Sequence, residues 1–237
     1  MLTLVRTFML VVLAIMPQLI KVLVYRKIFK YRIGKNIKLG IIIIDAVEFE
    51  IGDYSHISSG TIFWKCNTVS LGCKVEVGPL NLFRGVKYAK LDDYSSVLRL
   101  NVINAIIEPN FKLPVSSIFS LGYGSVITSE HRIDCTDKVT IGAYSVIGGR
   151  NSSIWTHNRR NGKSVFIGDN CYIGSETRFA PGARVPSKCI VGIGSVVVDS
   201  FVAEEQFLAG SPARHLRWLT QNDRELIFDK TRPDIPD

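Results

Sequence analysis

The 237-residue chain lacks the close-spaced ligand pairs that most zinc and redox sites use. It contains no C-x-x-C pair, and no two of its four histidines lie within six residues of each other. We therefore expect no metal. The five cysteines are odd in number and widely spread, which argues against a disulfide framework and favours a reducing compartment.

The chain also lacks an uninterrupted apolar run long enough to cross a bilayer. Apolar residues extend from Phe8 to Met16, and Pro17, Gln18 and Lys21 then interrupt them. A spanning helix needs about 20 predominantly apolar residues. No small-x-small cleavage site follows the run, which argues against a secretory signal.

Residues 1–32 are therefore expected to form a membrane-associating helix, with three interpretations open. We favour a helix embedded in one leaflet over a spanning helix or a helix that docks on a partner. Basic residues follow the apolar run and suit anionic headgroups: Arg26, Lys27, Lys30, Arg32, Lys35 and Lys38. With the net charge of +8, they predict a peripheral or interfacial membrane contact and a cytoplasmic protein at the inner face of the cell membrane. No basic and aromatic motif for RNA or DNA is present, so no nucleic acid is expected as a partner.

A six-residue count runs through most of the chain. From Ile167 onward each sixth residue is apolar: Ile167, Ile173, Phe179, Val185, Val191, Val197 and Ala203. Glycine often follows the apolar residue, as at Ile51-Gly52 and Ile141-Gly142. A helix cannot produce this period, because six residues at 100° return a side chain to the wrong face. The count predicts short strands stacked in coils, with one apolar residue per repeat facing inward and glycine at the turns, where a Cβ would be costly.

Three segments carry a resemblance to the hexapeptide-repeat acyltransferases. They are "HRIDCTDKVTIGAYSVIGGRNSSIWTH" (131–157), "VFIGDNCYIGSETRFAPGARVP" (165–186) and "VGIGSVVVDSFVAEEQFLAGSPARHLR" (191–217). They are most similar to the branch that O-acetylates sugars of cell-surface polysaccharides. The resemblance implies a mainly β protein, a left-handed parallel β-helix over residues 33–210. An N-terminal apolar helix precedes it, and a short C-terminal helix and tail over 211–237 follow. A homotrimer with active sites in the clefts between neighbouring coils is also implied.

The repeat is interrupted between Ile147 and Ile167. Twenty positions separate them where three repeats would give eighteen, so two residues are expected to leave the coil within "NRRNG". His157 lies where this interruption starts. Acyl transfer from a thioester to a hydroxyl needs a base, and imidazole suits that role. Thr156-His157 matches the family's T-H motif, so the resemblance implies that His157 is the base.

Further site residues are expected around His157 and on the later coils. His131 and Glu130 are secondary catalytic candidates. His131 would approach the acceptor or orient His157, and Glu130 would polarise an imidazole. Candidates for contact with the acceptor are Trp155, Asn151, Arg159 and Arg160. By resemblance, the donor acetyl-CoA would lie along Gly174, Ser175, Ala180, Gly192 and Ser195, with Arg214 and Arg217 at its phosphates. Residues 90–120 lose the glycine turns and predict irregular coils or a loop that shapes the acceptor pocket.

The sequence thus predicts an O-acetyltransferase that moves acetyl from acetyl-CoA to a hydroxyl of a sugar or glycan. The expected mechanism is direct attack by the hydroxyl, with His157 as base and no acyl-enzyme. Two alternatives stay open. One is an N-acetyltransferase acting on an amino-sugar, and the other is a non-catalytic β-helix scaffold at the membrane.

Overall fold

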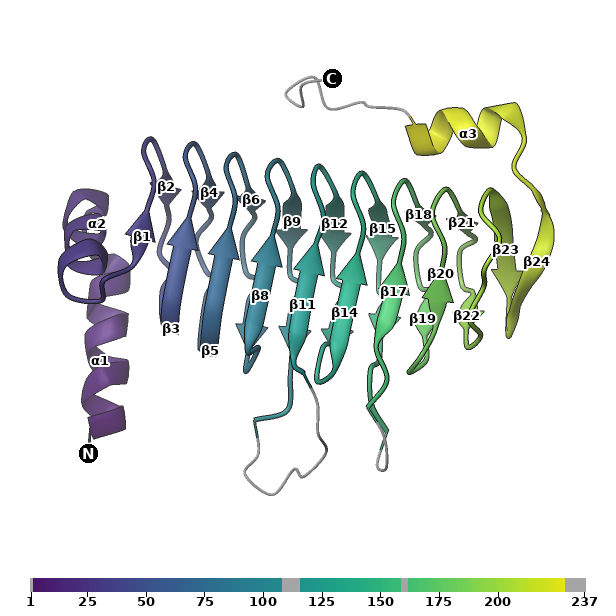
Figure 1. Cartoon of the computed structure of the whole chain (residues 1–237). Helices are drawn as coiled ribbons and strands as arrows, with labels where there is room; N and C mark the ends of the chain where they lie inside the picture. Colours follow the sequence, from purple (N-terminus) through teal and green to yellow (C-terminus); the bar gives the residue numbers. More distant parts are fainter. Residues whose placement is uncertain (1, 108–115, 159–161, 229–237) are drawn as a thin grey trace.

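A computed structural model describes residues 2–107, 116–158 and 162–228. Successive strands wind around a single axis and stack into three faces, each made of parallel strands (Figure 1). Helices α1 (Leu2–Ile15) and α2 (Gln18–Lys27) precede the coils, and α3 (Gln221–Phe228) follows them. The predicted left-handed parallel β-helix with helices at both ends is confirmed.

The three faces are rows of short, parallel strands. The first face contains β1 (Arg32–Ile33), β8 (Tyr88–Leu91), β11 (Ile118–Leu121), β14 (Lys138–Ile141), β17 (Val165–Ile167) and β20 (Arg184–Val185). The second contains β2 (Lys38–Leu39), β4 (His56–Ile57), β6 (Glu76–Val77), β9 (Ser96–Arg99), β12 (Val126–Ser129), β15 (Val146–Arg150), β18 (Tyr172–Ile173), β21 (Ile190–Val191) and β23 (Gln206–Gly210), which the antiparallel β24 (Ala213–Trp218) closes. The third contains β7 (Leu82–Arg84), β10 (Val102–Asn104), β13 (Arg132–Asp134), β16 (Ser153–Ile154), β19 (Arg178–Phe179) and β22 (Val196–Val197). The longer β3 (Ile43–Ile51) and β5 (Ile62–Leu71) bend from the third face to the first.

The core is a set of apolar ladders inside the coils. The residue that points inward pairs with its equivalent one coil later, as Leu121 does with Ile141 and Ile141 with Ile167. Stacked rings continue the ladder, and the ring centroids of Phe63 and Phe83 are 4.7 Å apart. The predicted register is buried from residue 167 to residue 197. It fails at Ala203, which is exposed, because Ser200 bridges to Arg184 and Phe201 packs against the core instead.

The repeat glycines lie at the corners, where a Cβ would be costly as predicted, and the reason is close packing of the coils. A Cβ on Gly122 would lie 2.5 Å from the backbone carbon of Gly142 in the next coil. The left-handed conformation occurs two residues after such a glycine, at Tyr54, Lys74 and Tyr144, with φ near 59°, 53° and 54°. The glycines are therefore required by the distance between coils rather than by φ.

The coils vary in length where the chain leaves the solenoid. One turn takes 18 residues from Ile167 to Val185 but 30 from Leu91 to Leu121. The coil is regular through β9 and β10, so the departure expected over 90–120 begins only at residue 105. Its residues 108–115 lie outside the described part of the chain.

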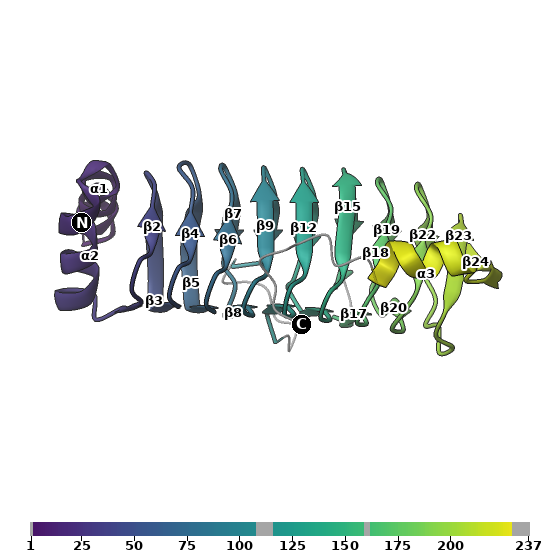
Figure 2. The same cartoon turned by 90° about the horizontal axis from the view of Figure 1, so that it is seen from above.

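The ends of the solenoid are covered differently. Helices α1 and α2 lie across the first coil, whereas α3 lies along one edge of the last coils (Figures 1 and 2). Leu219 and Ile227 pack against Ile190 beneath α3. Within the described residues, no helix has both the length and the apolarity that crossing a membrane requires.

Candidate active site

His157 lies at the base of an excursion from the third face. The chain leaves the coil after β16 and returns before β17, with a bridge between His157 and Gly162 and a 2.7 Å hydrogen bond from the Lys163 N–H to the Thr156 carbonyl. This coil takes 26 residues from Ile141 to Ile167, against 18 in the next. The coil therefore contains eight additional residues rather than the two predicted, one between Ile147 and Ile154 and seven in the excursion between Ile154 and Ile167, because the interruption spans two repeats and not three.

The His157 ring contacts a carboxylate from the preceding coil. Oδ1 of Asp134, the last residue of β13, lies 2.9 Å from Nδ1 of His157. The register places β13 beside β16, with Ile133 opposite Ile154, so the residues after both strands meet at one corner. Asp134 is buried and His157 is mostly buried, which shields the pair from bulk water.

Two buried threonines fix the Asp134 carboxylate. The Thr156 hydroxyl donates to Oδ1 at 2.9 Å, and the Thr136 hydroxyl donates to Oδ2 at 3.1 Å. Each hydroxyl also accepts a backbone N–H, from Asp137 and Ile106 respectively, so its own proton is directed to the carboxylate. An ionised carboxylate only accepts hydrogen bonds. Nδ1 of His157 therefore carries the ring proton, and the lone pair is on Nε2, the arrangement of a general base.

The sequence missed Asp134, and the partners it favoured lie elsewhere. The six-residue count does not align Ile133 with Ile154, 21 residues later, so the register that brings Asp134 next to the segment ending in His157 comes from the structure. Glu130 lies at the other end of β13, and no contact between it and His157 is found among the described residues. Glu130 instead lines a cavity with Asn151, and its catalytic role stays a prediction.

His131 organises a turn rather than the His157 ring. It is buried, its Nδ1 accepts the Ser152 N–H at 3.1 Å, and its Nε2 lies 3.0 Å from the Thr128 hydroxyl. Burial lowers the pKa of His131 to about 4, which keeps the ring neutral. Both ring nitrogens are thus used at a different corner, so His131 does not orient His157.

The acceptor candidates are divided between two corners. Trp155 is half-exposed and stands two residues before His157. The residues on either side of it, Ile154 and Thr156, are buried, so Trp155 and His157 lie on the same outward side of the chain. Asn151 instead joins Glu130 in a polar cavity of about 410 Å³ at the corner before β16, with Arg178 donating to its carbonyl at 2.9 Å. Arg159 and Arg160 lie outside the described residues.

The donor candidates are similarly divided. Ala180 follows β19 in register with Trp155, on the His157 corner. Gly174, Ser175, Gly192 and Ser195 follow β18 and β21 on the neighbouring corner. The N–H groups of Gly174, Ala180 and Gly192 already donate to the next coil. Ser195 is buried, and its hydroxyl donates to the Gly192 carbonyl at 2.6 Å, so in this chain it completes a turn.

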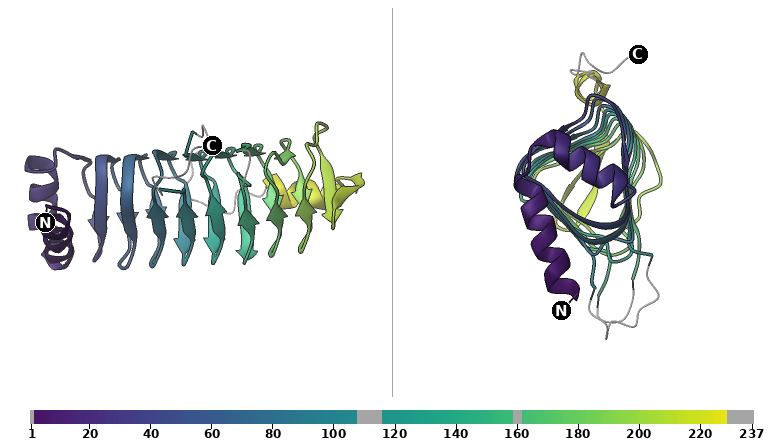
Figure 3. Two further views of the ribbon diagram at one scale, coloured as in Figure 1. Left: turned by 90° about the horizontal axis from the view of Figure 1, so that it is seen from below. Right: turned by 90° about the vertical axis from the view of Figure 1, so that its left-hand side faces the viewer.

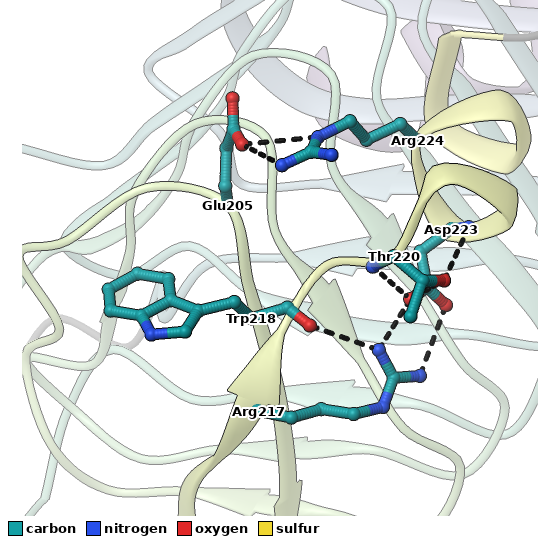
Figure 4. Close-up of polar contacts among 6 residues, drawn as sticks. All are labelled: Glu205, Arg217, Trp218, Thr220, Asp223 and Arg224. Carbon is teal, nitrogen blue, oxygen red and sulfur yellow. Dashed lines mark hydrogen bonds and ion pairs between the residues drawn. The ribbon is translucent and has the colours of Figure 1, made fainter.

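The two arginines expected at the donor phosphates have carboxylate partners within the chain. Arg214 contacts Asp199 at 2.5 Å. Arg217 pairs with Asp223 on α3, which raises the pKa of the guanidinium and lowers that of the carboxyl (Figure 4). Their contact with a donor stays a prediction.

Relatives with named activities match part of the chain. No protein-family model matches it. The galactoside O-acetyltransferase of Escherichia coli is 24% identical over 135 residues, which are 53% of this chain and 66% of that protein. WcaF, an Escherichia coli protein named as a colanic acid biosynthesis acetyltransferase, is 26% identical over 121 residues, 48% of this chain and 66% of the relative. The chain thus spans just under two thirds of each.

A solved structure extends the likeness in fold. The polySia-specific acetyltransferase NeuO superposes with a TM-score of 0.51 at 17% identity, covering 85% of this chain and 89% of that one. The six-residue repeat, the stacked coils and these matches agree with one another. The resemblance predicted from the sequence is therefore confirmed: the chain has the repeat and the fold of the hexapeptide-repeat proteins, and its named relatives are acetyltransferases of galactosides and polysaccharides.

Proposed function

We propose that the protein transfers acetyl from acetyl-CoA to a hydroxyl of a sugar or glycan, as a homotrimer at the inner face of the cell membrane. The observation that carries the proposal is the Asp134–His157 pair at the base of the excursion. A buried carboxylate that fixes the tautomer of a partly accessible imidazole suits proton abstraction from an alcohol. The kind of acceptor is supported by the named activities of the relatives.

In the proposed reaction the acceptor hydroxyl attacks the thioester carbonyl directly. Nε2 of His157 takes the hydroxyl proton as the new C–O bond forms, and Asp134 stabilises the imidazolium. The C–S bond then breaks, and the imidazolium returns the proton to the departing sulfur, which leaves free CoA thiol and the acetyl ester.

An acyl-enzyme through a cysteine is not part of this mechanism. Cys135 follows Asp134 but is fully buried, and burial raises the pKa of its thiol well above the ordinary value. Cys73 is exposed but follows β5 on the first face, away from the His157 corner. The other described cysteines are buried.

The test is an assay with purified full-length protein, acetyl-CoA and a panel of soluble oligosaccharides. We expect stoichiometric release of CoA thiol and a product heavier by one acetyl group, bound through oxygen. His157→Asn should abolish both, whereas the exposed His215→Asn should keep them. An amide-linked product would overturn O-acetylation. Absence of acetyl-CoA binding by calorimetry would overturn catalysis altogether and favour a scaffold.

A further inference from the structure

The two N-terminal helices form a flat cap on the solenoid. Both run across the first coil in a plane perpendicular to the solenoid axis (Figure 3). Leu10, Leu13 and Tyr25 face the coil and are buried. Lys21 is buried with them, and its Nζ donates to the Gly40 carbonyl at 2.5 Å and to the Ala14 carbonyl at 3.2 Å. These contacts hold the cap rigidly against the coils.

The cap exposes large apolar side chains on both of its helices. Phe8 and Ile15 on α1 are 72% and 68% exposed, and Leu19 and Leu23 on α2 are 85% and 59% exposed. Such a concentration of exposed apolar residues is unusual for a surface that faces only water. An open groove of about 630 Å³ runs beside α2, and its lining combines apolar with basic side chains: Leu19, Val22, Leu23, Arg26, Lys27 and Lys35.

The net positive charge of the protein is concentrated at this end. Residues 1–44 contain eight of the 29 lysines and arginines and none of the 21 acidic residues. The remaining 21 basic residues equal the acidic residues in number, so the rest of the chain is neutral overall. On α2, Arg26 and Lys27 follow Leu19 and Leu23 at helical spacing, which places apolar and basic side chains on one surface.

We propose that this cap docks on a bilayer containing anionic phospholipid, with its apolar side chains in the outer part of one leaflet and its basic side chains on the headgroups. The charge distribution favours lipid over a second copy of the chain, because two caps face to face would bring like charges together. The inference deepens the proposed membrane location. It is independent of the chemistry at His157.

The plane of the cap also fixes the orientation of the solenoid. With the cap on the bilayer, the solenoid axis lies along the membrane normal. His157 belongs to the sixth coil, which begins at Ile141, five coil spacings from the first coil at Ile33. Parallel strands are about 4.8 Å apart, so the candidate active site stands about 25 Å beyond the first coil. If the proposed function holds, the acetylated sugar lies on a glycan that extends this far from the membrane.

Vesicle sedimentation tests the docking. Full-length protein should pellet with vesicles of equal parts phosphatidylcholine and phosphatidylglycerol and remain in solution with phosphatidylcholine alone. Leu19→Glu with Leu23→Glu should abolish binding, and Arg26→Gln with Lys27→Gln should lower the partition coefficient about thirtyfold at low salt. The matched control is Ile193→Glu with Val202→Glu, two equally exposed apolar residues in the last coils, which should bind as wild type.

The proposal would be overturned if the Leu19/Leu23 variant bound vesicles as wild type does. It would also be overturned if the wild-type protein dimerised through its caps and did not bind the vesicles. Failure of membrane docking can be distinguished from failure of the proposed function by an assay with a soluble acceptor. The Leu19/Leu23 variant should keep wild-type acetyl transfer to that acceptor. Energy transfer to labelled lipid tests orientation, with a dye at Glu76→Cys or Glu204→Cys in a Cys73→Ser background. End-on docking requires more transfer from position 76, and equal transfer would refute it.

Discussion

Oδ1 of Asp134 lies 2.9 Å from Nδ1 of His157, and the two residues lie at the same corner of neighbouring coils. The first prediction concerns this contact. In Asp134→Asn the amide can present its N–H₂ to Nδ1, which favours the ring tautomer with the proton on Nε2. The lone pair needed for the base is then lost. We expect kcat to fall about a thousandfold with little change in the KM for acetyl-CoA.

The matched control for that variant is Asp137→Asn. Asp137 lies three residues further on, and its carboxylate accepts the Ser116 hydroxyl instead of the imidazole. Its transfer rate should stay within a few-fold of wild type. A full-rate Asp134→Asn enzyme would show that the carboxylate only supports the fold of the corner.

The sequence predicted the coils because the inward residue of each rung is set by a six-residue count. That count also located the interruption at His157. It could not identify the partner of His157, because that depends on which residues of different coils come into register. Asp134 and His157 are 23 residues apart, whereas the adjacent rungs Ile133 and Ile154 are 21 apart, and neither distance follows from an eighteen-residue turn.

The corners at which the donor candidates lie could not be predicted for a related reason. A repeat gives every corner the same local pattern, so Gly174 and Gly192 were indistinguishable from residues on the His157 corner. The structure separates them, since only Ala180 follows the strand in register with Trp155. Local pattern therefore predicted the type of coil, while the assignment to corners required the actual coil lengths.

The second prediction follows from His131. An ordinary imidazole has a pKa of about 6.5, and burial lowers that of His131 to about 4. Between these values the unfolded chain binds more protons than the folded one. This contribution to stability is thus fully present above pH 6.5 and declines as the pH falls towards 4, by roughly 3 kcal/mol in all.

Urea unfolding at pH 7 and pH 5 measures this dependence. His131→Asn places an amide oxygen where Nδ1 accepts the Ser152 N–H and removes the titration. The variant should lose less stability than wild type between the two pH values, while the exposed His215→Asn should behave as wild type. Identical losses in wild type and His131→Asn would contradict the assignment.

The third prediction concerns the distance between coils. A Cβ at Gly122 would lie 2.5 Å from the Gly142 backbone, and neither strand can move without disturbing its ladder. Gly122→Ala should therefore lower the free energy of unfolding by about 1–3 kcal/mol. At Gly192, which follows β21 on the second face, the nearest atom is the Ala209 Cβ at 3.1 Å. Gly192→Ala should cost clearly less in the same denaturation experiment, and a reversed order would refute the packing argument.

The fourth prediction concerns the attachment of α3 to the last coils. Asp223 accepts the N–H and the hydroxyl of Thr220 at 2.7 and 2.6 Å and pairs with Arg217, while Arg224 contacts Glu205 at 2.7 Å (Figure 4). These partners lower the pKa of the Asp223 carboxyl. Its contribution is present above the ordinary carboxyl pKa of about 4 and is lost as the pH falls through the lower, folded value.

Asp223→Asn should therefore loosen α3 at neutral pH without unfolding the coils. For a partly exposed ion pair, amide exchange in residues 221–228 should accelerate about fivefold, while exchange in β14 and β17 stays unchanged. Glu225→Gln removes one charge from an exposed position of the same helix and should exchange as wild type. The difference in amide-exchange rate between wild type and Asp223→Asn should become smaller in strongly acidic solution, where Asp223 becomes protonated. Equal exchange at neutral pH would show instead that Leu219 and Ile227, packed on Ile190, hold the helix without the ion pair.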